Sequence, residues 1–538
     1  MKAFIAALAV SAIALAVGAS AATSAPSKQD LLVGYDHAPT AADIAAITNA
    51  GGSVRRSFKS INVLAVNLPS GKAADIRSQA GVSYVETDAV RTPQSLSGTL
   101  PTSQLVPSAT NGLYGLVTTH TVAAQAAGYK GAGVTACVAD TGLDTRHPDI
   151  APNLLDTYNV FGNKGAGTEG LHATDVYDLG VADTETHATH VSGIVLGADN
   201  GLGIVGMAPA AKLKEARVLE THPDGSVSGE TSDVMAGVQW LATHGCQVIN
   251  MSLGGGDRSQ AEEALYNQVR KNGTTIVVAA GNDANNQLSF PGAYQSVVSV
   301  GAVDSSNQLA SFSNTGAQLD LVAPGVDNLS SFPTTEGRDA FVQWGSNTYG
   351  GNPAEFAGST SASGVTATFV NCGKMLTAND CGTQAPGFIA VIQRGTVSFA
   401  TKVDNAMHAG AAFALLYNNT TVPVTPTLGT TTDKGTPWIP TIIISQADGQ
   451  AIVAGLAATP TGTAANAVMA WNLDSGTSMA TPHVTGLVAL ILGKDPKLTP
   501  DQVETIMERS TTDLGVPNYD TKFGWGLINT QAALAATP

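Results

Sequence analysis

Short, nearly continuous apolar runs separated by helical patterns dominate the chain after about residue 110. A run of this kind is typical of a strand that is buried on both faces, as in a parallel sheet. The runs cover residues 133–139, 213–219, 246–251, 275–280 and 297–303, and residues 232–244 and 261–272 carry apolar positions at helical spacing. We therefore expect an α/β fold with a mainly parallel central sheet, whose functional residues lie at the carboxyl ends of the strands.

The region before this sheet has a different pattern. Residues 29–90 predict a small α+β unit, with strands at 31–35, 61–66 and 82–86 and helices at 41–50 and 73–79. Residues 91–108 are rich in Ser, Thr, Pro and Gln, which is typical of an exposed linker that proteases can reach.

A second β-rich module is expected at residues 340–465. Its apolar runs at 388–395, 412–419 and 439–444 flank a helical pattern at 399–409. This module divides the α/β pattern into two parts, residues 109–332 and 470–538.

Composition narrows the class of protein. Hydrophobic residues make up 43% of the chain and charged residues 13%, which indicates a globular protein. The formal net charge of −16 argues against a nucleic-acid partner. Residues 1–22 have the basic start, apolar run and small-residue end of a secretory signal peptide, and no later run is long enough to span a membrane. We expect a soluble, secreted, monomeric protein.

Four cysteines are few for this length, so disulfides are not the main source of stability. Cys372 and Cys381 flank a polar loop, and in an oxidising compartment we expect them to pair. Cys137 and Cys246 lie in apolar, strand-like runs and are interpreted as buried core residues, with a bond between them left open.

Three motifs carry the candidate chemistry. Residues 476–483 read Gly-Thr-Ser-Met-Ala-Thr-Pro-His ahead of an apolar helical pattern. Ser478 would thus lie at a helix N-terminus, where unpaired N–H groups favour developing negative charge, and Pro482 is expected within the first turn. Upstream are Val-Ala-Asp-Thr-Gly, with Asp140, and Thr-His-Ala-Thr-His-Val-Ser-Gly, with His187. Together these motifs resemble those of the subtilisin-like serine proteases, in that family's order Asp, His, Ser.

The resemblance implies a serine endopeptidase. Ser478 would be the nucleophile, His187 the general base and acid, and Asp140 the group that orients the imidazole. Ala188 stands where the family has glycine, so a tight turn there could be strained. Asn282, after Ala-Ala-Gly, would donate to the oxyanion. The segment Ser252, Leu253 and Gly254 would bind substrate as an added strand.

The same resemblance implies the remaining parts. Residues 29–90 would be an inhibitory pro-segment that is cut away in the linker at 91–108, and residues 340–465 would be a protease-associated domain. Structural calcium would be bound by the side chains of Asp149 and Asn200 and the carbonyls of Ala198, Leu202 and Ile204. No organic cofactor is expected, and the partners are protein or peptide substrates and the chain's own pro-segment.

Three other interpretations concern these motifs and the inserted module. His187 and His190 could bind zinc, but no acidic residue lies between them, so His190 is assigned a structural role. Asp140-Thr-Gly and Asp474-Ser-Gly resemble halves of an aspartic-protease dyad, but that architecture is all-β. A catalytically decayed binding protein that uses the inserted module remains the alternative function.

Overall fold

The structure is a computed structural model. It describes residues 27–94, 114–162, 186–222, 226–334, 337–421, 424, 426–430, 432 and 435–538. Their contacts divide the chain into two units, Met1–Thr87 and Asp88–Pro538. The predicted signal peptide and residues 95–108 of the predicted linker lie outside the described residues.

The first unit is a four-stranded antiparallel sheet in the order β2-β3-β1-β4, with two short helices. Its elements are β1 (Lys28–Tyr35), α1 (Ala41–Asn49), β2 (Ser53–Phe58), β3 (Val63–Pro69), α2 (Ala73–Arg77) and β4 (Val82–Thr87). Thr40 and Asp43 form a capping box that starts α1, and Ile47 and Ile76 bury the helices against the sheet. The sequence pattern did not reveal β2, an edge strand in which Phe58 is the one fully buried residue.

The centre of the second unit is a seven-stranded sheet in the order β15-β14-β13-β11-β6-β8-β7, in which every pairing is parallel. The strands are β6 (Thr135–Asp140), β7 (Leu154–Asn159), β8 (Lys212–Arg217), β11 (Val248–Met251), β13 (Thr275–Ala279), β14 (Val298–Val303) and β15 (Leu321–Pro324). The predicted α/β fold with a parallel central sheet is confirmed.

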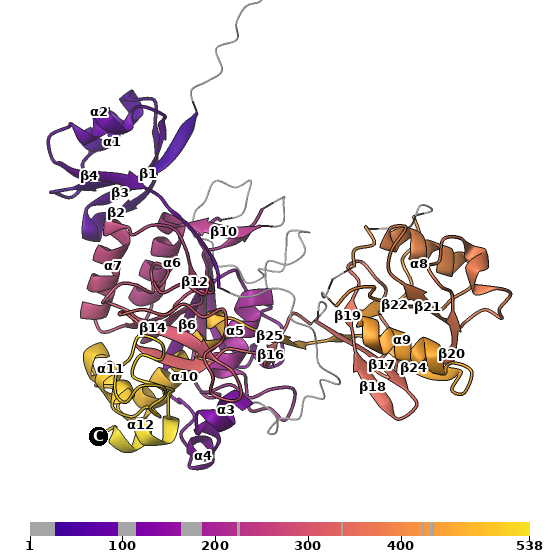
Figure 1. Cartoon of the computed structure of the whole chain (residues 1–538). Helices are drawn as coiled ribbons and strands as arrows, with labels where there is room; N and C mark the ends of the chain where they lie inside the picture. Colours follow the sequence, from indigo (N-terminus) through magenta and orange to yellow (C-terminus); the bar gives the residue numbers. More distant parts are fainter. Residues whose placement is uncertain are drawn as a thin grey trace, which may run out of the picture. The chain divides into compact units, whose positions relative to one another are not determined.

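Helices of this unit pack on the sheet or on one another (Figure 1). They are α3 (Tyr114–Thr118), α4 (Thr121–Ala126), α5 (Thr186–Leu196), α6 (Thr231–Thr243), α7 (Gln260–Lys271), α10 (Thr477–Lys494), α11 (Pro500–Glu508) and α12 (Thr530–Ala536). Helix α10 is the central one, because it is buried along almost its whole length and packs on α5 and on β11, β13, β14 and β15. Its apolar side chains share one core with those of α5 and the sheet.

A small sheet in the order β12-β5-β10-β9 extends from the carboxyl ends of the central strands. It consists of β5 (Val90–Pro93), β9 (Glu220–Thr221), β10 (Val227–Glu230) and β12 (Leu253–Gly254). Strand β5 is antiparallel to both β12 and β10. The chain between the first unit and the central sheet therefore lies as a strand between two others, although the sequence predicted an exposed linker from residue 91.

The inserted region forms an eight-stranded mixed sheet in the order β18-β17-β24-β20-β21-β22-β23-β19. Its elements are β17 (Gly337–Trp344), β18 (Asn347–Gly350), β19 (Asn352–Pro353), β20 (Val365–Asn371), β21 (Ile389–Gln393), α8 (Phe399–His408), β22 (Phe413–Tyr417), β23 (Thr441–Ile444), α9 (Gln446–Gly455) and β24 (Thr461–Met469). The chain enters through β16 (Asn328–Ser331) and leaves through β25 (Trp471–Asp474), and these two strands pair antiparallel.

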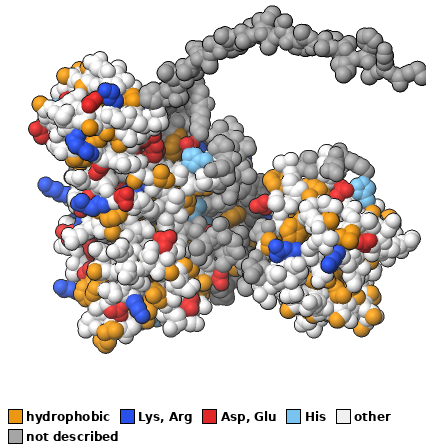
Figure 2. Space-filling view, turned by 45° about the horizontal axis from the view of Figure 1, so that its top comes forward, with side chains coloured by type: hydrophobic (Ala, Val, Ile, Leu, Met, Phe, Trp, Pro, Cys, Tyr) orange, Lys and Arg blue, Asp and Glu red, His pale blue; other side chains and the backbone are white. Residues whose placement is uncertain are grey.

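Charged side chains are few and scattered on the face shown in Figure 2, where basic side chains do not form a continuous patch. Within the described residues, no helix combines the length and the apolar character that a membrane span requires.

Candidate active site

Asp140 and His187 meet at the carboxyl edge of the central sheet. Asp140 ends β6, and His187 lies in the first turn of α5. The Nδ1 atom of His187 lies 2.7 Å from Oδ1 of Asp140, and the two side chains are 7% and 0% exposed. A proton on Nδ1, donated to the carboxylate, leaves the lone pair of a neutral imidazole on Nε2. This is the tautomer that can accept a proton from a nucleophile.

Ser478 is held at the start of α10 by Ser252. The Ser478 hydroxyl donates to the Ser252 carbonyl at 2.9 Å, and the Ser252 hydroxyl donates to the Ser478 carbonyl at 2.8 Å. Pro482 is the sixth residue of α10, so the expectation that it lies in the first turn was wrong. Because proline has no N–H, it cannot donate to the carbonyl four residues earlier, which is that of Ser478. That carbonyl is thus available to Ser252.

The register of the sheet brings the two pairs together. Val138 of β6 lies opposite Asn250 of the neighbouring parallel strand β11. Asp140 and Ser252 each follow by two residues, so they lie at the same level on strands that are about 4.8 Å apart. His187, bonded to the first, and Ser478, bonded to the second, are therefore neighbours at one sheet edge.

Asn282 lies after the next strand, β13, and points its amide at a backbone carbonyl. Its Oδ1 accepts the N–H and the hydroxyl of Thr477, each at 2.9 Å. This fixes which end of the amide is the donor, and Nδ2 donates to the Gln94 carbonyl at 2.6 Å. The Ser478 N–H donates to the same oxygen at 3.0 Å. Two donors therefore converge on the carbonyl of the Gln94–Ser95 peptide bond.

The residues before this bond lie as an added strand. Pro93 pairs with Leu253 and Thr92 with Gly254, and the Gln94 N–H donates to the Ser252 carbonyl at 3.1 Å. The predicted substrate-binding residues are thus in contact with the chain's own segment, in the pairing that an extended peptide uses.

A serine beside an Asp–His pair, with two donors on one carbonyl, is the arrangement of a serine hydrolase. The model of the subtilase family matches residues 131–375 and 447–526 of the chain, and that of the PA domain matches residues 345–452. The chain belongs to the subtilase family.

The relatives of this subtilase agree. Subtilisin E of Bacillus subtilis (strain 168) is 32% identical over 325 residues, which are 59% of this chain and 77% of the relative. An alkaline protease of Shouchella clausii is 30% identical over 335 residues, 60% of this chain and 79% of the relative. Like these proteases, the chain is a subtilisin-like serine endopeptidase.

Solved structures show the same fold. The psychrophilic subtilisin-like protease Apa1 from the Antarctic psychrotroph Pseudoalteromonas sp. AS-11 superimposes with a TM-score of 0.51 and 28% identity, covering 78% of this chain and 97% of that one. Fervidolysin from Fervidobacterium pennivorans covers 95% of this subtilase and 61% of its own chain, with a TM-score of 0.58 and 22% identity.

Two uncertainties about the histidine motif have structural answers. Ala188 lies inside α5, is fully buried in the core, and its N–H donates to the Thr141 hydroxyl at 3.2 Å. A methyl group in a helix adds no backbone strain, so the strain considered from the sequence does not arise.

The Nε2 atom of His190 lies 3.0 Å from the Asn328 carbonyl and 3.1 Å from that of Asn472, and burial lowers the pKa of this imidazole to about 3. His190 thus joins α5 to the β16–β25 pair as a neutral side chain.

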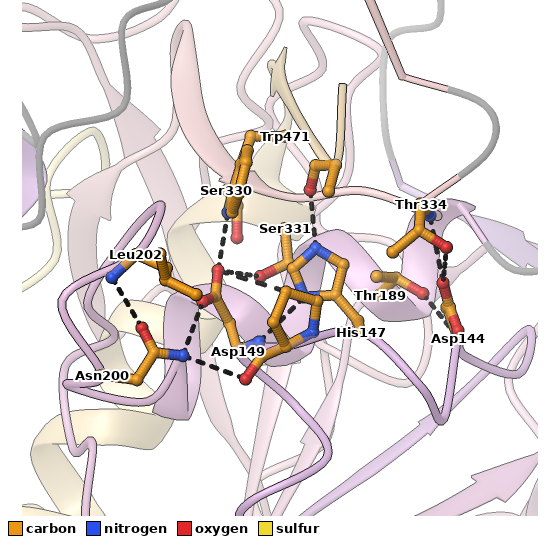
Figure 3. A network of polar contacts seen from close by, with 12 residues as sticks. Asp144, His147, Asp149, Thr189, Asn200, Leu202, Ser330, Ser331, Thr334 and Trp471 are labelled. Atoms are coloured by element: carbon orange, nitrogen blue, oxygen red, sulfur yellow. Dashed lines mark hydrogen bonds and ion pairs between the residues drawn. The ribbon is translucent and has the colours of Figure 1, made fainter. Parts of the chain in front are cut away.

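The residues predicted to bind calcium form a hydrogen-bonded network around Asp149 (Figure 3). The Asp149 carboxylate is fully buried. Its Oδ2 accepts the indole N–H of Trp471 at 2.6 Å and the hydroxyl of Ser331 at 3.2 Å, and its Oδ1 accepts the Asn200 amide at 3.3 Å. Burial raises the pKa of this carboxyl group, and the hydrogen bond from Trp471 opposes that effect.

In this arrangement the residues do not fit a calcium ion. The Asn200 amide also donates to the Pro148 carbonyl at 3.0 Å, while its Oδ1 accepts the Leu202 N–H at 2.8 Å. These partners fix which end of the amide faces Asp149, and it is the donor. The Ala198 carbonyl accepts the Asn200 N–H at 2.9 Å. Calcium requires converging oxygens, whereas here N–H and O–H donors converge on the carboxylate. Leu202 and Ile204, whose carbonyls were the remaining predicted ligands, lie in the same loop, with the side chain of Ile204 buried and that of Leu202 exposed.

Both cysteine pairs are bonded in the structure. Cys372 is bonded to Cys381, and Cys137 of β6 is bonded to Cys246, just before β11. The second bond joins neighbouring strands of the central sheet, whose carboxyl ends carry Asp140 and Ser252.

Sequence reasoning missed Gln94, Thr477 and the residues around Arg91. Thr477 is adjacent to the serine, but a hydroxyl at a helix start usually indicates only a cap. Arg91 is the one charged residue in the stretch 91–108, which was the available signal.

Proposed function

We propose that this subtilase cleaves peptide bonds through an acyl-enzyme on Ser478. The observation that carries the proposal is the Gln94 carbonyl, which accepts hydrogen bonds from Asn282 and from the Ser478 N–H. This is the position that the carbonyl of a scissile bond requires, because the charge that develops on its oxygen is then met by donors already in place.

The roles of the residues follow from their contacts. The Ser478 hydroxyl turns from the Ser252 carbonyl to Nε2 of His187, which takes its proton as the oxygen attacks the carbonyl carbon. Asp140 accepts the Nδ1 proton of His187 and stabilises the imidazolium. Asn282 and the Ser478 N–H stabilise the oxyanion. The imidazolium then protonates the leaving amine. In the second half of the reaction His187 takes a proton from a water molecule, which attacks the acyl carbon, and then returns that proton to the Ser478 oxygen as the acid leaves.

The chain is proposed to be made as a secreted zymogen. Residues 1–22 would direct export, and residues 29–90 would be the inhibitory pro-segment, ahead of a protease divided by a protease-associated insert. Strand β5 supports inhibition, because substrates would need the place between β12 and β10 that it fills. The first cut would then fall between Gln94 and Ser95, after which the enzyme acts on other proteins, as a monomer.

The experiment that tests this proposal follows the full chain during its own maturation. Purified chain should give a product whose N-terminal residue is Ser95, detected by N-terminal sequencing and intact-mass spectrometry. The Ser478→Ala variant should stay uncut, and so should His187→Ala, whereas Ser363→Ala, a change in an exposed serine of the insert, should mature normally. A Ser95 terminus from folded Ser478→Ala protein would contradict the proposal.

Calcium remains a prediction from the resemblance alone. No step above uses the ion, because the Asp149 network as it stands has no open set of oxygen ligands. If the full chain proves inactive although folded, the alternative is a binding protein that uses the inserted domain.

A further inference from the structure

Arg91 differs from the other side chains of β5. It is the fourth residue before the Gln94–Ser95 bond, and its exposed fraction is 0%, whereas that of Val90 is 51%. Thr92 and Pro93 are partly exposed. A fully buried arginine needs an acceptor for its charge, since Arg is almost never buried without a partner.

That acceptor is Glu262, in the first turn of α7. The Arg91 Nη2 atom lies 2.7 Å from Oε2 of Glu262, and Nε lies 3.4 Å from Oε1. Neither side chain is exposed. Nη2 also donates to the Asp257 carbonyl at 3.2 Å, and Nη1 donates to the Gly255 carbonyl. Each of the three guanidinium nitrogens therefore has an acceptor.

The pocket that encloses the Arg91 guanidinium contains further hydrogen-bond donors to the Glu262 carboxylate. The Tyr266 hydroxyl donates to Oε1 of Glu262 at 3.1 Å, and the Tyr294 hydroxyl lies 2.9 Å from Oε2. Burial, and secondly the Glu262 charge, hold the pKa of both tyrosines well above the usual range, so both stay protonated donors. The Glu262 N–H donates to the Ser259 hydroxyl at 3.1 Å. These contacts do not involve Arg91, so they remain when the cleaved segment leaves.

The shape of the pocket fits arginine more closely than lysine. The guanidinium is a planar fork that reaches the carboxylate and two carbonyls together, which a single ammonium cannot do. Gly256, with a φ of +69°, borders the fork, and a Cβ there would lie 2.6 Å from Nη1. A glycine at this position therefore leaves room for the guanidinium.

We propose that Glu262 makes the mature enzyme selective for substrates with arginine four residues before the bond that is cleaved. This inference rests on the proposed function, because it assumes that substrates take the place of β5. The competing explanation is that the Arg91–Glu262 pair only anchors the pro-segment, in which case the mature enzyme would not discriminate at this position.

The test uses the matured wild-type enzyme and quenched fluorescent peptides with the sequence of residues 90–97, Val-Arg-Thr-Pro-Gln-Ser-Leu-Ser. Replacing the arginine by alanine should lower kcat/KM by about 10²–10⁴-fold, the range expected when one partner of a buried ion pair is removed. The lysine peptide should give a kcat/KM between those of the arginine and alanine peptides. Replacing the threonine by alanine is the control and should change kcat/KM less than about threefold, because the Thr92 hydroxyl makes only long hydrogen bonds, at 3.3 Å to the Gly254 carbonyl and at 3.5 Å from the Gln94 side-chain amide.

Equal rates for the arginine and alanine peptides would overturn the selectivity but leave the proposed function intact. No cleavage of any peptide or of denatured casein would instead be a failure of the proposed function.

Variants locate the selectivity in the pocket. Glu262→Gln keeps the side-chain volume but removes the charge, so the ratio of kcat/KM between the arginine and alanine peptides should fall by at least tenfold. Glu263→Gln is the matched control. The Glu263 carboxylate pairs with Arg258 outside the pocket, so the ratio of kcat/KM between the two peptides should be unchanged. An unchanged ratio in Glu262→Gln would overturn the inference. If that variant does not mature, the wild-type peptide series decides the question alone.

Discussion

Replacing Asp320 by asparagine should stabilise the protein in alkaline solution and change it little in acid. The Asp320 carboxylate accepts the Ser299 N–H at 2.7 Å and the Ser299 hydroxyl at 2.9 Å. Burial, and to a smaller extent the charges of Glu504 and Glu508, raise its pKa from 3.8 to about 7. Asparagine can accept the same two hydrogen bonds without carrying a charge.

The sign and size of this pH dependence follow from the linkage between proton binding and folding stability. Because the folded pKa lies above the unfolded one, the folded state binds the proton more tightly, and stability is lost as the pH rises from about 4 to about 7. A difference of this size between folded and unfolded pKa corresponds to roughly 4 kcal/mol. Water still reaches part of Asp320, so we expect the variant to gain roughly 2 kcal/mol between pH 4.5 and pH 8.5.

The assay is urea unfolding of Asp320→Asn at both pH values. It should be made in the Ser478→Ala background, so that the chain cannot digest itself. Chelator should be present, so that no ion neutralises the neighbouring carboxylates of Asp320, Glu504 and Glu508. Asp199→Asn is the control, because Asp199 forms an exposed ion pair with Lys130 and its loss should cost less than about 1 kcal/mol at either pH. A gain in Asp320→Asn that is equal at pH 4.5 and 8.5 would show that the stability of the folded protein does not depend on the charge of Asp320.

Three other predictions concern the site and the Asp149 network. Asn282→Leu removes one of the two donors to the Gln94 carbonyl and should slow the appearance of the Ser95 terminus by about 10²–10³-fold. Asn285→Leu, in the same loop with an exposed side chain, should mature at the wild-type rate, and a loss below tenfold in Asn282→Leu would contradict the oxyanion role. Trp471→Phe removes a donor from the buried Asp149 carboxylate and should cost about 1–3 kcal/mol in urea unfolding. Because the Asp149 network stands without calcium, strong chelator should leave the wild-type Tm within about 1 °C, and a fall of 5 °C or more would show that the folded chain binds a stabilising ion.

The sequence predicted the central strands where burial on both faces gives a continuous apolar run, as in β6, β11 and β13. It did not reveal β7, an edge strand of mixed polarity, or β15, the strand at the opposite edge, whose short apolar run ends at Pro324. Local pattern cannot indicate such strands, because their positions depend on neighbours that are distant in the chain.

The same limit applies to the site. The serine, histidine and aspartate motifs are local, so they could be recognised in the sequence. Arg91 and Glu262 are separated by 171 residues, and Asn282 and Gln94 by 188. Glu262 in isolation looks like an ordinary acidic residue in the first turn of a helix. Trp471 is 322 residues away from Asp149 in the chain, so the sequence could not indicate that its indole N–H bonds the carboxylate that was predicted to bind calcium.

Labelling of the matured protein with a fluorophosphonate, followed by mass spectrometry of the labelled peptide, identifies the nucleophile. An activated serine should carry the label at Ser478, and His187→Ala should abolish it in folded protein. Label on another residue, or none on a folded chain with a Ser95 terminus, would contradict the proposed mechanism.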